Sequence, residues 1–388
     1  MKIIKKGFNK QPTIAFVANT AWFIFNFRIG IIRKLQVLGY HIIVITPDDN
    51  KYSIKLQQEG CQHVPIILDA TGISIINEIK SIYNLYAVYA QIKPHFIFHY
   101  TIKLNIYGTI AAFLNQIPRI AVVCGTGYVF LKKNLLYYWV IGLYRLSFAL
   151  ANEVWFPNND EKKFFETKKI ATPSKTRLLP GEGINTTFFK PTLTSKPQDK
   201  YIFLLTARLI WDKGIKEYAE AARILKEKYG AKIECQLLGF LNANNPHAIS
   251  QNVVNQWHTE KIINYMGATE DVRPYLEKVH CFVLPSFYCE GTPRSLLEAA
   301  SMELPIITTD NQGCRDVVEH GFNGFLTQPK NVSDLVAKME QMFLSSKEMQ
   351  TQMGKKGRLK VIQNFEETLV LPYYLNSLKK FGLCPSYF

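Results

Sequence analysis

The feature that most constrains the fold of this chain is a regular alternation of short apolar runs with longer helical segments. In the first half we predict strands at residues 13–18, 41–46, 95–99, 119–124, 154–157 and 176–179, separated by helical segments such as 25–38. Strands that alternate with helices form parallel sheets covered by helices on both faces. We therefore expect a doubly wound α/β domain.

The alternation stops at a turn-forming run, Leu179 to Gly183, and a polar stretch at 190–199, and then begins again. Further strands are predicted at 200–206, 232–238, 262–266, 281–285, 304–308 and 324–327, and helices at 215–228 and 271–279. A chain of 388 residues is too long for one ordinary core. We expect two Rossmann-like domains facing a cleft, at 1–190 and 191–364, and a C-terminal helix at 365–388 that can cross back to the first domain.

Composition excludes several classes of protein. The seven cysteines are scattered without a C-x-x-C, which argues for a reducing compartment and against a disulfide framework or structural zinc. The eight histidines show no H-E-x-x-H spacing and the chain has no D-x-D, so no metal site is predicted. The net charge of +15 is compatible with nucleic acid, an anionic membrane face or phosphorylated substrates.

The stretch 134–156 is the nearest to a membrane span, but Arg145 interrupts it. Its unbroken part is shorter than the ~20 residues that a span needs. We interpret it as a buried helix followed by a strand, with one aromatic face able to touch lipid.

Two acids, Glu290 and Glu298, have seven residues between them. Thr292 suits the cap of a helix and Pro293 its first position, so Glu290 would lie in the loop before the helix and Glu298 in its second turn. Both carboxylates could then reach one pocket above a helix end that favours phosphate. Phosphate and hydroxyl recognition together describe a sugar nucleotide.

Acids at this spacing are more often solvated surface charges. The surrounding pattern favours a site, because a predicted strand precedes the loop and another follows the helix. Ligands of such α/β units bind at the carboxyl ends of the strands, where this loop lies.

At this point the motifs resemble a known family. The run from Glu290 to Glu298 is similar to the signature of family 4 retaining glycosyltransferases, which have the GT-B fold. Four further motifs of that family are matched in order, at Leu179 to Asn185, Thr206 to Gly214, Asn311 to Val318 and Gly321 to Leu326. A narrower resemblance, at Ala18 to Arg28, Gly125 to Phe130 and Gly313 to Arg315, is to the capsular-polysaccharide branch. That branch includes enzymes that add N-acetylgalactosamine to undecaprenyl-diphosphate-linked bacillosamine.

The resemblance implies a role for each matching residue. Arg208 and Lys213 would bind the donor diphosphate, Glu298 the ribose hydroxyls, and Glu290 would face the donor sugar. The remaining donor-side positions are Gly291, Thr292 and Pro293 near phosphate and sugar, and Val272 near the nucleobase.

The implied reaction is retaining transfer of a hexose or N-acetylhexosamine from a UDP-sugar, without metal or other cofactor. The implied acceptor is a lipid-diphosphate-linked saccharide, with no nucleic acid as partner. Such an acceptor lies in the anionic cytoplasmic face of the plasma membrane, and we expect the first domain to attach there peripherally through the basic residues Lys2, Lys5, Lys6, Lys10, Lys132 and Lys133 and the neighbouring aromatic residues. The chain departs from the family on the acceptor side, where Val123-Cys124-Gly125 replaces a Thr-x-His-Gly motif. His99 is the nearest substitute as a catalytic group, and a packed core histidine is the equally weighted alternative. Arg28 would meet the acceptor phosphate or pair with a helix neighbour.

Other classes fit less well. A GT-B-fold epimerase would need its own acid and base, a phosphorylase a pyridoxal-phosphate lysine and a much longer chain, and a dinucleotide oxidoreductase a G-x-G-x-x-G after the first strand. A basic nucleic-acid-binding protein is supported by charge alone.

Overall fold

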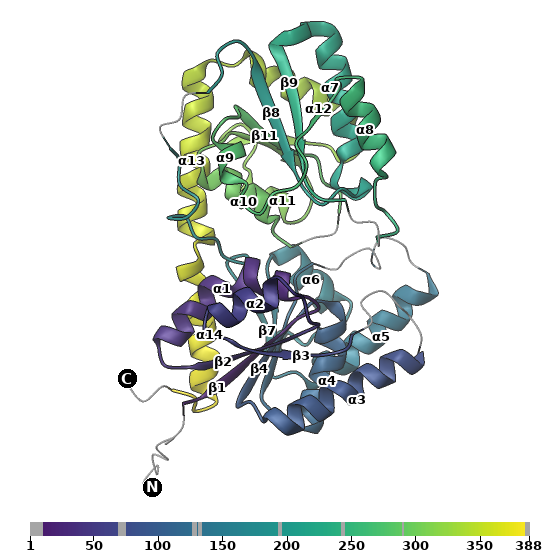
Figure 1. Cartoon of the computed structure of the whole chain (residues 1–388), viewed down its shortest axis with the longest axis vertical. Helices are drawn as coiled ribbons and strands as arrows, with labels where there is room; N and C mark the ends of the chain where they lie inside the picture. The colour runs from purple at the N-terminus through teal and green to yellow at the C-terminus, as the bar shows by residue number, and fades with distance from the viewer. Residues whose placement is uncertain are drawn as a thin grey trace. The chain divides into compact units, whose positions relative to one another are not determined.

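The computed structural model describes residues 11–68, 75–125, 130, 134–192, 196–241, 245–288 and 291–384, with 75 and 76 described by their backbone. The chain divides into two compact units (Figure 1). The first comprises residues 1–183 and 367–388, and the second comprises residues 184–366.

The first unit contains a parallel sheet with the strand order β3-β2-β1-β4-β5-β6-β7 among the described residues. The strands are β1 (Thr13–Val17), β2 (His41–Thr46), β3 (Gln62–Pro65), β4 (Phe96–Tyr100), β5 (Arg119–Val122), β6 (Glu153–Phe156) and β7 (Thr176–Leu178). The order changes direction between β1 and β4, so the topological switch point of this doubly wound sheet lies there.

Helices cover both faces of this sheet. They are α1 (Ala21–Val37), α2 (Tyr52–Gln58), α3 (Ile75–Ile92), α4 (Thr109–Leu114), α5 (Leu135–Leu150), α6 (Asn159–Thr167) and α14 (Glu367–Lys380), with a π-helical turn at Leu104–Gly108 and a 3₁₀ turn at Pro173–Lys175. Successive side chains of β1 enter opposite cores: Ile14 and Phe16 pack with α1 and α14, and Ala15 and Val17 with α3 and α5. Burial on both faces explains why its strands are continuous apolar runs.

The second unit repeats the topology, with the order β10-β9-β8-β11-β12-β13. Its strands are β8 (Tyr201–Thr206), β9 (Ile233–Leu238), β10 (Asn264–Tyr265), β11 (Cys281–Leu284), β12 (Ile306–Thr309) and β13 (Gly324–Thr327). Its helices are α7 (Ile215–Tyr229), α8 (Gln251–Thr259), α9 (Arg273–Leu276), α10 (Arg294–Ser301), α11 (Cys314–Val317), α12 (Val332–Leu344) and α13 (Lys347–Phe365), with 3₁₀ turns at Trp211–Lys213 and Gly230–Lys232. The predicted pair of doubly wound sheets is confirmed.

Some local predictions differ from the structure. The first helix begins at Ala21 rather than at residue 25, because the Thr20 hydroxyl accepts a hydrogen bond from the Phe23 N–H at 3.1 Å and caps the helix earlier. The edge strand β3 and the helices α12 and α13 had not been predicted.

The division between the units falls at 183/184 and 366/367, where we had expected 190/191 and 364/365. Ile184 forms a parallel bridge to Glu366, and its N–H donates to the Phe365 carbonyl at 2.9 Å. Phe189 is buried in the core of the second unit. Residues 184–190 therefore pack with the second unit, and α14 packs with the first.

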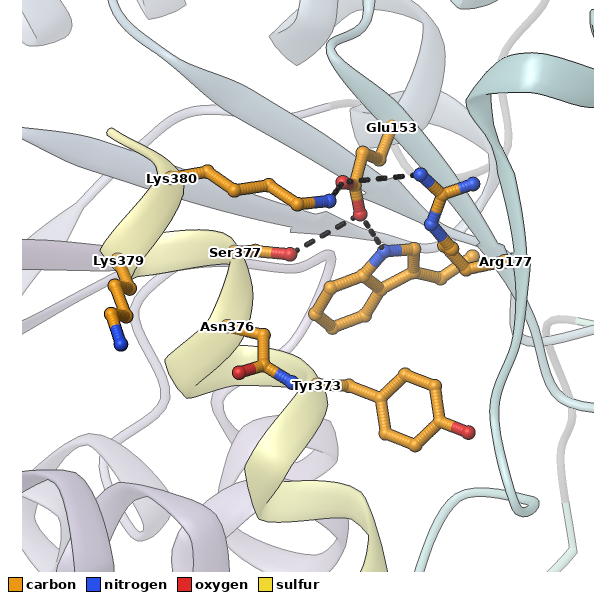
Figure 2. A pocket seen from close by; sticks show the side chains of 8 residues that line it. Glu153, Arg177, Tyr373, Asn376, Ser377, Lys379 and Lys380 are labelled. Carbon is orange, nitrogen blue, oxygen red and sulfur yellow. Dashed lines mark hydrogen bonds and ion pairs between the residues drawn. The ribbon is translucent and has the colours of Figure 1, made fainter. Parts of the chain in front are cut away.

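A pocket of about 540 Å³ between α14 and the edge of the first sheet shows how α14 is held (Figure 2). Glu153, the first residue of β6, accepts hydrogen bonds from Lys380 at 2.5 Å and Ser377 at 3.2 Å, both on α14, and from the Trp155 indole at 2.8 Å. Burial by itself would raise the pKa of Glu153, but these contacts outweigh it and lower the pKa. The carboxylate is thus occupied in anchoring α14, at the amino-terminal edge of the sheet.

The stretch 134–156 forms helix α5 followed by strand β6, as predicted. Among the described residues, no helix is both long enough and apolar enough to cross a membrane.

Candidate active site

In the second unit the switch point lies between β8 and β11, which pair in parallel with Cys281 opposite Phe203. The loops that leave these two strands therefore begin at the same edge, where ligands of such sheets bind. Gly214 ends the first loop with φ of 73°, and a Cβ there would lie 2.1 Å from the Pro285 carbonyl oxygen in the second. Only glycine permits this close approach.

The loop after β8 carries both predicted cations. Arg208 follows the strand end and is half-buried, and its carbonyl accepts the N–H of Ile210 at 2.8 Å. Lys213 ends the short 3₁₀ turn and is 7% exposed, with Nζ 5.5 Å from the centre of the Tyr288 ring. Lys213 is therefore part of the packed edge rather than a solvated surface lysine.

The loop after β11 is fixed by hydrogen bonds up to Tyr288. The Phe287 N–H donates to the Asp212 carbonyl at 3.0 Å, and the Asn311 amide donates to the Tyr288 carbonyl at 3.0 Å. The Thr309 hydroxyl donates to the Ser286 carbonyl. Glu290, the predicted sugar-facing residue, lies outside the described residues.

Helix α10 begins one residue later than expected. The prediction that Thr292 caps it and Pro293 is its first residue was wrong: Pro293 is the cap, with ψ of 117°, and Arg294 is the first helical residue. The Pro293 carbonyl accepts the N–H of Leu296 at 3.1 Å, as the carbonyl of a cap residue does. Gly291 and Thr292 are both buried in the approach to the helix.

Glu298 lies in the second turn of α10, as predicted. Its side chain is 15% exposed and accepts a hydrogen bond from Arg294 Nε at 3.0 Å, one turn earlier. Burial raises the pKa of Glu298, and Arg294 opposes that shift without cancelling it. A nearly buried carboxylate at the first turns of α10 is suited to accept hydrogen bonds from ligand hydroxyls.

Val272 lies further along the same edge, after the outer strand β10. It is the cap residue of α9 and packs, half-buried, against the core of the unit. Its neighbours Asp271 and Arg273 form an ion pair at 2.7 Å, and Arg273 stacks on the Phe188 ring at 3.7 Å. The role of Val272 beside a nucleobase stays a prediction.

His99 does not form part of an exposed site. It is fully buried in β4 of the first unit, and its Nε2 lies 3.1 Å from the Tyr89 hydroxyl. Burial, with a smaller contribution from Arg119, lowers its pKa to about 3, so the ring is neutral. A Cβ at Gly108 would lie 2.4 Å from the ring, which shows how closely the ring is enclosed. The structure favours the core alternative for His99 over the catalytic one.

Arg28 pairs with Glu182 at 3.2 Å within the first unit and is 3% exposed. Its guanidinium also lies 4.8 Å from the centre of the Tyr100 ring and donates to the Phe27 carbonyl at 2.9 Å. The partner is therefore a residue of the turn after β7, which neither expectation for Arg28 had named.

The pair of Asp212 and His247 at the β8–β11 edge was not predicted from the sequence. His247 Nδ1 lies 2.5 Å from Asp212 Oδ2, although 35 positions separate the two residues. Asp212 lies inside the motif that contains Arg208 and Lys213, but no spacing or motif connects it with His247.

The fold agrees with what the comparison with known families shows. Residues 189–360 match the family described as Glycosyl transferases group 1, and residues 13–158 match the one described as Glycosyl transferase 4-like. The chain is thus a glycosyltransferase, an enzyme with two Rossmann-like domains. It belongs to the group 1 and family 4-like glycosyltransferases of GT-B fold.

Two relatives span most of the chain. The chain is 28% identical over 386 residues to the N,N'-diacetylbacillosaminyl-diphospho-undecaprenol alpha-1,3-N-acetylgalactosaminyltransferase of Campylobacter jejuni. This match covers 93% of this chain and 97% of that protein. It is 24% identical over 307 residues to the UDP-Gal:alpha-D-GlcNAc-diphosphoundecaprenol alpha-1,3-galactosyltransferase of Escherichia coli, covering 76% and 77%.

Solved structures share the fold at lower identity. A glycosyltransferase from Rickettsia africae has a TM-score of 0.77 at 17% identity, covering 97% of this chain and 99% of that one. HepE from Anabaena, solved in complex with UDP and glucose, has a TM-score of 0.75 at 15% identity, covering 94% and 99%.

Proposed function

We propose that this enzyme transfers a hexose or N-acetylhexosamine from a UDP-sugar to a lipid-diphosphate-linked saccharide, with retention of configuration, during bacterial polysaccharide or glycoprotein glycan assembly. The observation that carries the proposal is the β8–β11 switch point, where Arg208 and the packed Lys213 lie on one loop and the approach to α10 forms the other. Cations fixed at a strand end suit a diphosphate.

The donor is held by groups from both loops. Arg208 and Lys213 bind the diphosphate, Glu298 accepts hydrogen bonds from the ribose hydroxyls, and Glu290 faces the sugar. Gly291, Thr292 and Pro293 line the approach to phosphate and sugar, and Val272 lies beside the nucleobase. The raised pKa of Glu298 fits a carboxylate that is withdrawn from water. The ribose hydroxyls take the place of that water.

The reaction requires stabilisation of a leaving UDP. The two cations stabilise the negative charge that grows on the diphosphate, so the reaction proceeds without metal or other cofactor. The acceptor hydroxyl attacks from the face that UDP leaves, and the departing phosphate takes its proton. His99 has no part in this scheme, because it is enclosed and neutral.

The acceptor class is supported by the relatives. The Campylobacter jejuni and Escherichia coli enzymes are both named for undecaprenol-diphosphate-linked acceptors. The experiment is incubation with a panel of UDP-sugars and polyprenyl-diphosphate-linked saccharides, with mass spectrometry of the product, NMR of the new linkage, and a parallel reaction in EDTA. We expect an α-linked product from an α-linked donor with EDTA present. An inverted linkage would refute retention of configuration. Loss of activity in EDTA would refute the metal-independent reaction.

The proposed attachment to an anionic membrane is supported by exposed apolar side chains of the first unit. Helix α4 packs against both α3 and α5 (Figure 1). These helices expose apolar and aromatic side chains: Ile79, Tyr83, Tyr86, Phe113, Leu114, Leu135, Tyr138, Trp139 and Leu146. We call these residues the α3–α4–α5 surface.

The charges around this surface complement acidic lipids. The one acidic residue in the three helices is Glu78, which is buried and paired with Lys103 at 2.7 Å, whereas Lys80 and Arg145 are exposed. Tyr and Trp favour the membrane interface, and each nearby cation contributes about 1 kcal/mol at an anionic surface. The enzyme therefore docks on the cytoplasmic face of the plasma membrane through the first unit.

Sedimentation with vesicles tests this docking. We expect the protein to bind phosphatidylglycerol vesicles at low salt and phosphatidylcholine vesicles much less. The double variant Tyr138→Ser/Trp139→Ser should reduce binding, and Leu344→Ser, an exposed leucine of the second unit, should not. Equal sedimentation of all three proteins would remove the α3–α4–α5 surface as the docking site.

A further inference from the structure

A carboxylate–imidazole pair lies at the β8–β11 switch point, beside the residues assigned to the donor. Asp212 Oδ2 and His247 Nδ1 are 2.5 Å apart. The Asp212 side chain is 9% exposed and the His247 side chain 38%. The carboxylate is thus buried, while the ring that it holds reaches the surface.

The backbone around His247 is fixed to the loop after β8. The His247 carbonyl accepts the N–H of Trp211 at 3.0 Å, and the His247 N–H donates to the Asn245 side chain at 2.8 Å. Ala248 forms an antiparallel bridge with Ile210. The position of the ring is therefore set by backbone pairing as well as by the Asp212 side chain.

Asp212 connects three loops of this edge. Its side chain holds His247, its carbonyl accepts the Phe287 N–H from the loop after β11, and the next residue in the chain is Lys213. The imidazole is therefore attached to the same short turn that ends in the packed lysine.

The pair leaves one ring nitrogen for a ligand. With Nδ1 bound to Asp212, only Nε2 remains, and no other described residue forms a hydrogen bond with it. In the imidazolium form both nitrogens donate, Nδ1–H to the carboxylate and Nε2–H outward. A carboxylate behind a histidine orients the ring and selects which nitrogen faces the ligand.

We propose that His247 binds a phosphate group of the nucleotide donor through Nε2–H, and that Asp212 is the positioning residue that orients the ring. This inference rests on the proposed function. Phosphate is the favoured ligand group because the short turn that holds the His247 ring also carries Lys213, and Arg208 lies in the same loop after β8.

Calorimetric titration of the full chain with UDP and with uridine tests the proposal. His247→Gln removes a charge-assisted hydrogen bond, so UDP affinity should fall about tenfold or more, while uridine affinity stays unchanged. His258→Gln is the matched control, because His258 is an exposed histidine of α8 whose Nδ1 accepts a backbone N–H. It should bind both ligands as the wild type does.

Two substitutions at Asp212 separate positioning from a merely structural role. Asp212→Asn keeps an oxygen that accepts from Nδ1–H, and Asp212→Ala removes it, so UDP affinity should fall less in the asparagine variant. Adding His247→Gln to Asp212→Ala should cause no further loss, because the ring has already lost its orientation. Independent, additive losses would overturn the positioning role.

The outcomes separate this inference from the proposed function. If the wild type binds no UDP, the proposed function fails. If the wild type binds UDP and His247→Gln binds it equally well, only the present proposal is overturned. A variant that keeps its UDP affinity but loses affinity for the intact UDP-sugar would show that the ring contacts the sugar, and would also overturn the phosphate assignment.

Discussion

The two units share one topology but use the carboxyl edge of their sheets differently. In the second unit Lys213 and Arg208 follow a strand end, and His247 reaches the surface. In the first unit Arg28 is enclosed by Glu182 and aromatic rings, and His99 lies fully inside the sheet. Cationic and imidazole side chains are therefore enclosed in the first unit, whereas in the second they lie at the sheet edge where ligands of such sheets bind. Chemistry in this fold is decided by the loops and not by the strand order.

Of the substitutions considered, replacement of the enclosed Arg28 should reduce the free energy of unfolding most. Arg28→Met leaves the Glu182 carboxylate without its partner, which should cost about 3–5 kcal/mol of unfolding free energy. Urea unfolding of the full chain measures this. Arg33→Met is the control, because the Arg33–Glu59 pair is more exposed and should contribute about 1 kcal/mol or less. Equal costs for the two variants would contradict the enclosed role of Arg28.

Lys213→Ala should lower turnover about a hundredfold, because it removes a fixed charge that stabilises the leaving diphosphate. Steady-state kinetics with the preferred UDP-sugar measures the loss. Lys216→Ala, at an exposed lysine paired with Glu220 on α7, is the matched control and should keep the normal rate. If Lys213→Ala kept a near-normal rate, as Lys216→Ala is expected to do, Lys213 would have no role in turnover and the site would lie elsewhere.

His99 should make stability depend on pH without affecting turnover. The unfolded ring takes up a proton near pH 6.5, whereas the folded ring does so only at about 3. Between these values the unfolded state binds more protons, so folding weakens as pH falls, by about 1.4 kcal/mol for each pH unit. Unfolding at pH 7 and pH 5 should show a smaller acid loss, by about 2 kcal/mol, in His99→Gln than in the wild type.

The control for His99 is activity. His99→Gln should retain its rate at pH 7, because the enclosed ring cannot reach an acceptor. An inactive but folded variant would restore the catalytic alternative.

The smallest expected effect is at Glu298. Glu298→Gln keeps the shape but weakens the acceptor of the ribose hydroxyls, so UDP affinity should fall about tenfold. The comparison of UDP with a 2'-deoxy analogue sharpens the test: the variant should lose most of the discrimination that the wild type shows between them. Unchanged discrimination would leave Glu298 with Arg294 as its only partner.

The sequence predicts the features of the fold and of the candidate site that depend on a local pattern of residues. Apolar runs and turn residues identify both sheets, and the loop with Arg208 and Lys213 can be placed at a strand end from sequence alone. The half-exposed edge strand β3 (Gln62–Pro65) lacks a continuous apolar run and so gives a weak signal. The burial of His99 depends on Tyr89 and Gly108, and the Asp212–His247 pair depends on backbone pairing between loops 35 residues apart. Such contacts depend on the packing of residues that are far apart in the sequence, and a local sequence pattern therefore does not predict them.

The return of α14 also affects the order in which the molecule is completed during synthesis. Lys34 pairs with Glu367, and the hydroxyl of Tyr100 lies 2.8 Å from that of Tyr374, so the first unit combines two segments that the second unit separates along the chain. The second unit is continuous and leaves the ribosome whole, while the first still lacks a helix of its core. The N-terminal unit is thus the last to be finished, and a chain that stops before Glu367 would expose the apolar sheet face that α14 covers.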